Sequence, residues 1–282
     1  MKFKINSELE YNVLSASTMI FNIHALRTLN QTVLEESLIV NPDIRVEEFT
    51  SSNSANRFMR LQIDKPMQLK VSYKATVDTQ YKLIDERQEA KTVPVVKMDG
   101  DIIQFLFPSR YCQSDKLQRL AYKEFGQIEN LYSKVLAIND WIYSNIEYVS
   151  GSTDSHTSAY DTITERVGVC RDFAHLGIAL CRALSIPARY FTGYAFKLNP
   201  PDFHACFEAY IGGNWILFDP TKLAPVNGLV KIATGRDAAD AAVATFFGNV
   251  RCSRLNVECD TTDSGFVPLN YSTEKLEGVS YQ

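Results

Sequence analysis

The stretch that decides the fold is VGVCRDFAHLGIALCRALSIPARYFTGY, residues 167–194, which predicts a helix that begins at a thiol. Apolar residues recur there at steps of three and four and form one helical face, and Pro187 ends the helix. These positions are Phe173, Ala174, Gly177, Ile178, Cys181 and Leu184. Cys170 therefore lies in the first turn, where unpaired N–H groups and the helix macrodipole favour an anion.

This placement makes Cys170 a candidate nucleophile. A helix N-terminus together with a nearby imidazolium lowers the pKa of a thiol from about 8.5 to roughly 3.5–7.5, and the thiolate is the reactive form. Taken alone, a cysteine is more often a buried structural residue. Cys181 lies on the same helical face three turns further along, and we expect it to belong to the core.

A second stretch, DFHACFEAYIGGNWILFDPT at residues 202–221, predicts a β-hairpin. Residues 203–211 alternate with a period of two, Gly212 and Gly213 form the turn, and residues 215–219 return as a strand that ends at Pro220.

The hairpin brings a histidine and an aspartate together. With a two-residue turn, His204 and Asp219 are diagonal neighbours on one face, about 7 Å apart at the backbone. A register shifted by two residues would place them directly opposite, and a shift by one would separate them. Taken singly, each has a structural explanation, as a histidine satisfied within a sheet and an aspartate at a strand end. Combined with Cys170, they indicate a Cys–His–Asp triad.

Several motifs around these residues resemble the core of the transglutaminase-like superfamily, closest to its bacterial members often labelled cysteine proteases. The motifs are GVCRDFAHL (168–176), ALCRALSIPARYFTGY (179–194), HACFEAY (204–210) and W-x-x-F-D-P-T (215–221), with PSRYCQSDK (108–116) and GRDAADAA (235–242) as further matches. The resemblance covers residues 108–250 and extends weakly upstream, where that group carries a β-rich region.

The resemblance implies a papain-like fold with Cys170 as nucleophile, His204 as general base and acid, and Asp219 as its orienting partner. It does not imply cross-linking, because the superfamily includes hydrolases, true transglutaminases and inactive members. We expect hydrolysis of peptide or amide bonds. The alternatives are a protein-glutamine γ-glutamyltransferase, a binding module of the same fold without turnover, and an enzyme activated by a partner that the β-rich region recognises.

The predicted chemistry is thiol acyl transfer on an amide or ester carbonyl of a protein or peptide. The Cys170 backbone N–H is the expected first oxyanion donor, because it points out of the helix N-terminus. The sequence does not identify the second donor, although Tyr148 and Tyr160 lie upstream of the helix.

Composition is typical of a globular enzyme: 282 residues, 45% hydrophobic and 22% charged, with a net charge of −4. Mild acidity argues against a nucleic acid or anionic membrane as partner, although a local basic patch would be hidden in the total. No apolar run is long enough for a spanning helix. The polar, alternating N-terminal residues and six scattered cysteines lead us to expect no signal peptide, reduced thiols and a cytoplasmic protein. The oligomeric state is not predicted.

We expect an α+β fold in two domains, at residues 1–109 and 110–282. Period-two stretches in the first (3–11, 19–23, 59–63 and 69–77) predict a β-sandwich. In the second, a helix bearing the nucleophile packs on an antiparallel sheet. Residues 115–147 predict two helices separated by Gly126, and residues 150–162 a polar loop before the nucleophile.

Other chemically suggestive residues have structural interpretations. We predict no metal site and no cofactor, because the Cys170/His175/Cys181 and His204/Cys206 spacings match no zinc motif. His175 would diverge from Cys170 around the helix. The remaining expectations are that Asp172 interacts with the helix dipole or a neighbouring loop, that Glu208 is a buried hydrogen-bond partner, that His156 is solvated, and that Arg236 pairs with Asp237.

Overall fold

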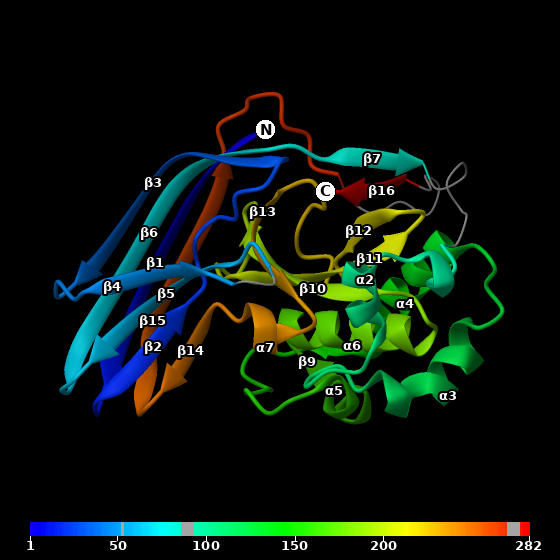
Figure 1. Cartoon of the computed structure of the whole chain (residues 1–282), viewed down its shortest axis with the longest axis horizontal. Helices are drawn as coiled ribbons and strands as arrows, with labels where there is room; N and C mark the ends of the chain where they lie inside the picture. Colours follow the sequence, from blue (N-terminus) through cyan, green and yellow to red (C-terminus); the bar gives the residue numbers. More distant parts are fainter. Residues whose placement is uncertain (52–53, 86–92, 270–276) are drawn as a thin grey trace.

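The computed structural model describes residues 1–51, 54–85, 93–269 and 277–282 of the chain. A β-sandwich and a mixed α/β region lie at opposite ends of the long axis (Figure 1). The sheets are almost entirely antiparallel, which confirms the α+β prediction. None of the described helices is long and apolar enough to cross a membrane.

Two four-stranded sheets form the sandwich, in the orders β15-β1-β6-β3 and β14-β2-β5-β4. Their strands are β1 (Lys2–Val13), β2 (Ser17–Phe21), β3 (Gln31–Asn41), β4 (Val46–Thr50), β5 (Arg57–Ile63), β6 (Met67–Thr79), β14 (Ala244–Phe247) and β15 (Val250–Thr261). Aromatic rings pack between the two sheets. The ring centroid of Tyr11 on β1 lies 5.6 Å from that of Phe21 on β2 and 5.2 Å from that of Phe246 on β14. The predicted sandwich is therefore confirmed.

The chain enters the sandwich twice. Strands β14 and β15 follow the α/β region in sequence and return to pair with β2 and β1, so that Phe246 lies opposite Met19 and Leu255 opposite Leu9. The boundary after residue 109 stays a prediction, and each sandwich sheet takes one strand from beyond it.

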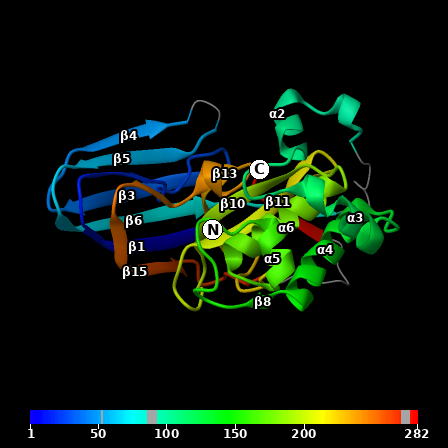
Figure 2. The same cartoon turned by 90° about the horizontal axis from the view of Figure 1, so that it is seen from below.

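The α/β region has a sheet in the order β12-β11-β10-β13, with its main helices on one face (Figures 1 and 2). The strands are β10 (Ala188–Ala195), β11 (His204–Ile211), β12 (Asn214–Phe218) and β13 (Leu229–Gly235). The helices are α3 (Ser114–Phe125), α4 (Leu131–Asn145), α5 (Ala159–Glu165), α6 (Cys170–Ala183) and α7 (Ala238–Ala241). Helix α6 packs closely on β11, since a Cβ at Gly177 would lie 2.5 Å from the Phe207 ring.

The local helix predictions hold, except at the end of one predicted loop and for three short helical segments. Helices α3 and α4 flank Gly126, and α6 begins at Cys170, as predicted. The predicted loop at residues 150–162 is wrong at its end, because α5 begins at Ala159 behind a Ser158–Asp161 capping box. Short helical segments absent from the predictions are η1 (Val95–Lys97), α2 (Gly100–Ile103) and η2 (Gln104–Leu106).

Two-stranded sheets complete the fold. Strand β8 (Glu147–Tyr148) pairs in parallel with β9 (Val167–Gly168), and β7 (Lys82–Asp85) pairs with β16 (Glu277–Ser280).

Side-chain amides from the sandwich cover the outer edge of β13. Gln31 donates to the carbonyl of Lys231 at 2.8 Å and accepts its N–H at 2.7 Å. Asn56 makes the same pair of contacts with Thr234, at 2.8 and 3.0 Å. Because an open strand edge carries unpaired backbone groups, these amides tie the two regions together where the sheet would otherwise be exposed.

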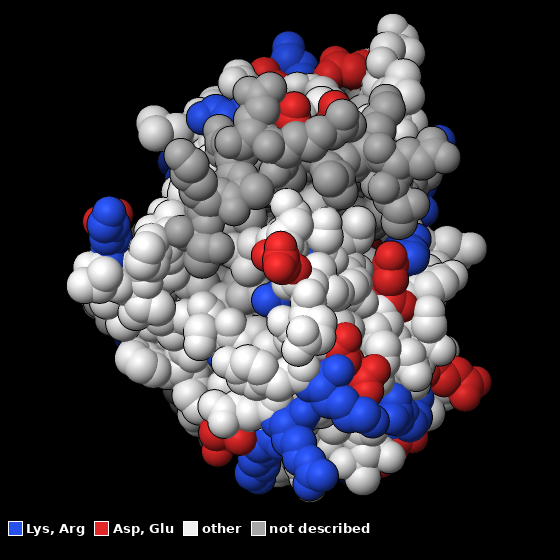
Figure 3. Space-filling view, turned by 90° about the vertical axis from the view of Figure 1, so that its right-hand side faces the viewer, with Lys and Arg blue, Asp and Glu red and all other residues white. Residues whose placement is uncertain are grey.

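The end of the molecule that carries α3 and α4 is uneven in charge. Figure 3 shows Lys and Arg side chains gathered in the lower part of this face, with acidic side chains scattered around them. The net charge of −4 therefore hides a local basic area.

Candidate functional site

The GVCRD motif builds a capped N-terminus for α6, the helix that begins at Cys170. Asp172 is fully buried and accepts the N–H of Val169 at 3.0 Å and the hydroxyl of Thr153 at 2.6 Å. Gly168 permits this cap, because a Cβ there would lie 2.9 Å from the Asp172 Cβ. Asp172 thus joins the helix start to the loop that contains Thr153, which confirms its predicted contact with a neighbouring loop.

The hairpin has the predicted register. Ile211 lies opposite Asn214 and Phe207 opposite Phe218, which places His204 and Asp219 diagonally beyond the last pair of the ladder. Their side chains meet, with His204 Nε2 2.8 Å from Asp219 Oδ2 and both residues 1% exposed.

Asp219 is held by further hydrogen bonds. Its Oδ1 accepts the N–H of Thr221 at 2.9 Å and the Thr221 hydroxyl at 2.6 Å, and its Oδ2 accepts the N–H of Ala224 at 3.3 Å. The sequence analysis missed Thr221, although a threonine two residues after an aspartate is typical of an Asx-type turn. These contacts fix the carboxylate that orients the imidazole.

The environment favours an ion pair between the two side chains. Burial disfavours the charged form of His204, but the charge of Asp219 outweighs burial and raises the pKa of His204 well above its usual 6.5. Burial likewise opposes the charge of Asp219, yet the imidazolium and the Thr221 hydrogen bonds lower the pKa of that carboxyl. A group with a shifted pKa in such a pair is typical of a functional site.

Cys170 lies next to this pair. It is partly exposed, and its side chain is among the groups that raise the pKa of His204. His204 Nδ1 is buried, and no described residue lies within hydrogen-bonding distance and angle of it. This nitrogen is therefore free to interact with the Cys170 thiol. A sulfur–nitrogen separation of about 4 Å stays a prediction.

Tyr148 also lies beside Cys170. Burial together with the Cys170 thiol raises the pKa of Tyr148 to about 12, although the nearby backbone N–H of Cys170 and the charge of His204 oppose that rise. The Tyr148 ring contacts Phe173 with centroids 5.7 Å apart, and it remains 38% exposed. Tyr160 is the other upstream tyrosine. The ammonium nitrogen of Lys116 lies over its ring, 5.0 Å from the ring centroid.

A second thiol lies close to the histidine and aspartate. The ligand atoms of His204, Cys206 and Asp219 all lie within 4.8 Å of one another, and all three residues are buried. This group is a poor metal site, because the direct hydrogen bond occupies His204 Nε2 and Asp219 Oδ2, and burial raises the pKa of Cys206 to about 12. Cys206 is therefore a buried, protonated thiol next to the pair.

Most of the other sequence expectations hold. Cys181 is buried, Glu208 is buried and bonds Arg189 and Lys231, and His156 is exposed. The predicted Arg236–Asp237 pair is wrong. Arg236 instead bonds Asp240, one helical turn on, at 2.9 and 3.0 Å, whereas Asp237 caps α7 and accepts the N–H of Tyr111.

His175 diverges from Cys170, as predicted. It is stacked against Tyr111 with ring centroids 4.9 Å apart, and its Nε2 accepts the N–H of Ala238 at 3.1 Å. Burial lowers its pKa well below 6.5, so it is a neutral structural residue.

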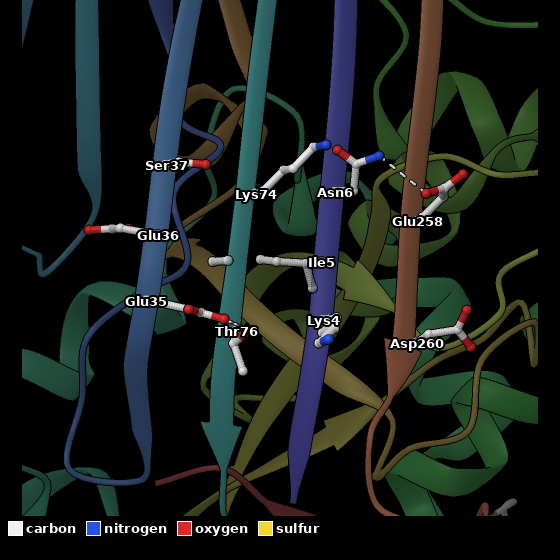
Figure 4. Close-up of a pocket in the computed structure, with 11 residues that line it drawn as sticks. Lys4, Ile5, Asn6, Glu35, Glu36, Ser37, Lys74, Thr76, Glu258 and Asp260 are labelled. Carbon is white, nitrogen blue, oxygen red and sulfur yellow. Dashed lines mark hydrogen bonds between the residues drawn. The ribbon is translucent and has the colours of Figure 1, made fainter.

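A large open hollow lies elsewhere, on the outer face of the sandwich. It has a volume of about 610 Å³, and Figure 4 shows the polar side chains of β1, β3, β6 and β15 around it. Glu258 accepts a hydrogen bond from Asn6 at 3.2 Å, and Glu35 accepts one from Thr76 at 2.6 Å. Lys4 and Lys74 lie among four acidic side chains, so the lining is negative on balance, and it contains no cysteine or histidine.

Comparison with known proteins shows the family to which the chain is similar. Residues 118–220 match the family described as the transglutaminase-like superfamily, and residues 1–101 match the bacterial transglutaminase N-terminal domain. A crystal structure from Cytophaga hutchinsonii, described as a "putative cysteine protease", is 70% identical with a TM-score of 0.97, and the match covers 100% of this chain and 98% of that one.

Two uncharacterized mycobacterial proteins are more distant relatives. The Mycobacterium leprae protein is 28% identical over 163 residues, which are 55% of this chain and 57% of that protein. The Mycobacterium tuberculosis H37Rv protein is 33% identical over 114 residues, which are 35% of this chain and 36% of that protein. The chain therefore matches about a third to just over half of the length of these relatives.

Proposed function

Because the chain belongs to the transglutaminase-like superfamily, we propose that it is a cysteine hydrolase that cleaves amide bonds in a protein or peptide. The observation that carries the proposal is the His204–Asp219 pair, joined at 2.8 Å, with the partly exposed Cys170 beside the ring at the N-terminus of α6. The 70% identity to a protein described as a putative cysteine protease favours hydrolysis over cross-linking.

In the proposed mechanism Cys170 is the nucleophile and His204 transfers the proton. The thiolate sulfur forms a bond with the carbonyl carbon, and the C=O electrons move to oxygen. The tetrahedral intermediate then collapses, the C–N bond breaks, and His204 protonates the leaving amine. His204 next removes a proton from water, which attacks the thioester and releases Cys170 and the carboxylic acid.

Asp219 is the orienting residue in this scheme. Its hydrogen bond to Nε2 directs Nδ1 of the same ring toward the thiol, and its charge stabilises the imidazolium. A carboxylate with three further hydrogen bonds keeps this orientation without having to take up the proton.

A paired assay tests the proposal. A library of fluorogenic peptide amides reports hydrolysis, and incorporation of a biotinylated amine into a glutamine peptide reports transamidation. We expect the wild type to hydrolyse members of the library, and Cys170→Ala and His204→Ala to abolish turnover. Cys252→Ala is the matched control, because Cys252 is an exposed thiol on β15.

The other outcomes separate the alternatives. Amine incorporation without hydrolysis would make the protein a transglutaminase. No reaction of either kind, with peptides still bound, would favour a binding module. Fractionation of the source cells would test the expectation of a cytoplasmic location.

A further inference from the structure

We propose that Asp202 is a specificity residue, whose carboxylate binds a lysine or arginine side chain of the substrate next to the scissile bond. The inference rests on the proposed function, because it concerns the substrate of the Cys170 site. It names the class of that substrate, a peptide with a cationic side chain at this position.

Asp202 lies at the edge of the candidate site. It is an exposed residue in the loop between β10 and β11, two residues before His204. Its carboxylate is close enough to act on the hydroxyl of Tyr148, and the charge of His204 in turn acts on the carboxylate. Asp202 therefore lies beside the two residues that adjoin Cys170, where side chains of a bound substrate would lie.

Hydrogen bonds fix the loop that carries Asp202. The N–H of Lys197 donates to the carbonyl of Cys259 on β15 at 3.0 Å, and Figure 2 shows this loop, in yellow, near the end of that strand. At the other end of the loop, the N–H of Phe203 donates to Asp202 Oδ1 at 2.6 Å. The carboxylate is thus held in one place relative to the sandwich and to β11.

The charges around the thiol cancel in pairs, except that of Asp202. His204 pairs with Asp219 at 2.8 Å, and Arg171 pairs with Asp172 at 2.9 Å. Within the described part of the chain, Asp202 forms no ion pair with a lysine or arginine, and the imidazolium is the cation that acts on its carboxylate. The mouth of the site therefore has a negative charge that a substrate can neutralise.

Incomplete solvation makes this charge a good partner for a cation. Although Asp202 is exposed as a residue, partial burial of its carboxylate raises its pKa above the usual 3.8. A carboxylate that has lost part of its water interacts more strongly with a nearby cation than a fully solvated one does. A lysine or arginine side chain gains from this interaction, whereas an acidic side chain is repelled.

The first test measures the charge preference at the thiol and requires no turnover. Aminoethyl and sulfonatoethyl methanethiosulfonate modify a thiol by the same displacement but carry opposite charges. Mass spectrometry measures the rate of each reaction at Cys170 in full-length protein at low ionic strength. Asp202→Asn removes only the charge, because the amide oxygen can still accept the Phe203 N–H, and Asp202→Glu keeps the charge. Asp43→Asn, in the exposed turn between β3 and β4, is the matched control.

We expect Asp202→Asn to lower the ratio of the cationic to the anionic reaction rate on the order of 10-fold. Asp202→Glu and Asp43→Asn should keep the wild-type ratio. Added salt should reduce the difference between the wild type and Asp202→Asn, because it screens exposed charges. Thermal melting of each variant checks that the fold is retained.

The second test measures substrate preference directly. Internally quenched peptides contain either lysine or norleucine at one of the two residues that flank the scissile bond, so that they differ only by the ammonium group. At one of these positions the wild type should have a kcat/KM for the lysine peptide roughly two- to fivefold above that for the norleucine peptide. Asp202→Asn should lose this preference, and Asp202→Glu should retain it.

Three results would overturn the inference: an unchanged reagent ratio in Asp202→Asn, a lysine preference that survives in this variant, or no lysine preference in a wild type that cleaves the peptides. Failure of the proposed function looks different. The wild type would then cleave no peptide, which would reject the substrate class together with the activity, while the reagent ratio would still fall in Asp202→Asn.

Discussion

At the scale of single residues, the site depends on which side chains are buried and which remain accessible. His204 and Asp219 are sealed from solvent, and Asp219 has enough hydrogen bonds to stay charged there. Cys170 is partly exposed, so its thiol is accessible, whereas the histidine and aspartate beside it are shielded from water. Burial strengthens the interaction within the pair, because charges attract more strongly in a low dielectric.

Cys170 should be the first thiol to react with limiting iodoacetamide. Four of the other cysteines are buried, and burial raises the pKa of Cys112 and Cys206 to about 12 and also raises those of Cys181 and Cys259. Cys252 is exposed, but burial of its sulfur raises its pKa, so it should react second. Peptide mapping after brief labelling measures the order, and equal labelling of Cys252 would contradict it.

Asp219→Asn should leave a residual rate and shift the pH profile. The imidazolium of His204 persists until the pH rises through its raised pKa, and loss of the Asp219 charge lowers that pKa. The alkaline limb of the pH–rate profile for p-nitrophenyl acetate should therefore move to lower pH, with kcat reduced on the order of 10⁴-fold. An unmoved limb would mean that Asp219 does not set the pKa of His204.

At the scale of elements, two contacts place the candidate catalytic groups. The capped N-terminus of α6 presents Cys170, and the contact of α6 with β11 sets the distance between the thiol-bearing helix and the strand that carries His204. In the sandwich, Glu36 of β3 accepts two hydrogen bonds from Arg57 at 2.8 and 2.9 Å and one from Tyr73 at 2.7 Å, which joins β3, β5 and β6.

Gly177→Ala should destabilise the protein by about 1–3 kcal/mol, the usual cost of overpacking a core. The added Cβ would lie 2.5 Å from Phe207 Cε1, and that ring is fully buried and stacked on Phe218. Urea denaturation measures the change in the free energy of unfolding. Gly100→Ala is the control, since nothing lies within 4 Å of its Cβ position.

Protonation of Glu36 should destabilise the sandwich in acid. Burial opposes its charge, but the Arg57 and Tyr73 hydrogen bonds outweigh burial and lower the pKa from 4.5 to about 2. The folded state therefore binds this proton less readily than the unfolded chain, so the contribution is complete above pH 4.5 and is lost as the pH falls toward 2.

Glu36→Gln should make the free energy of unfolding depend less on pH between 4.5 and 2. The urea midpoint of the wild type should fall more steeply than that of the variant between pH 4.5 and 2. Glu165→Gln, at an exposed position on α5, should follow the wild type. Parallel curves for the wild type and Glu36→Gln would show that Glu36 is not responsible.

At the scale of the whole molecule, the sandwich and the α/β region depend on each other. Strands β14 and β15 follow the sheet of the α/β region in sequence and complete the sandwich, while Gln31 and Asn56 of the sandwich close the edge of β13. Tyr194 of β10 adds a further link, because its buried hydroxyl donates to the carbonyl of Ile23 at 2.8 Å.

Gln31→Ala should destabilise the whole chain by about 1–3 kcal/mol, because it leaves the buried N–H of Lys231 without its partner. We expect one shifted transition in thermal melting, with both regions affected. Gln62→Ala, on the exposed side of β5, is the control. Two separate transitions in the variant would show that the regions unfold independently.

Short-range features were predictable because they depend on neighbours in sequence. Periodicity predicted α6 with Cys170 in its first turn, and the Gly212–Gly213 turn fixed the register that brings His204 to Asp219. The Arg236 error has the same origin. Sequence adjacency suggested Asp237, whereas the turn of α7 brings Asp240 to the guanidinium and turns Asp237 toward Tyr111.

The sequence by itself determined the fold class, the three candidate catalytic residues and the resemblance that connects them, because helix caps, alternation and tight turns are local. Only the tertiary structure decided that β14 and β15 return to the sandwich, that Gln31 and Asn56 close the edge of β13, and that Tyr148 rather than Tyr160 lies beside Cys170. Strand partners and approaching side chains come from segments tens to hundreds of residues apart. Burial and backbone hydrogen bonding across the whole chain select them, and no local pattern records that choice.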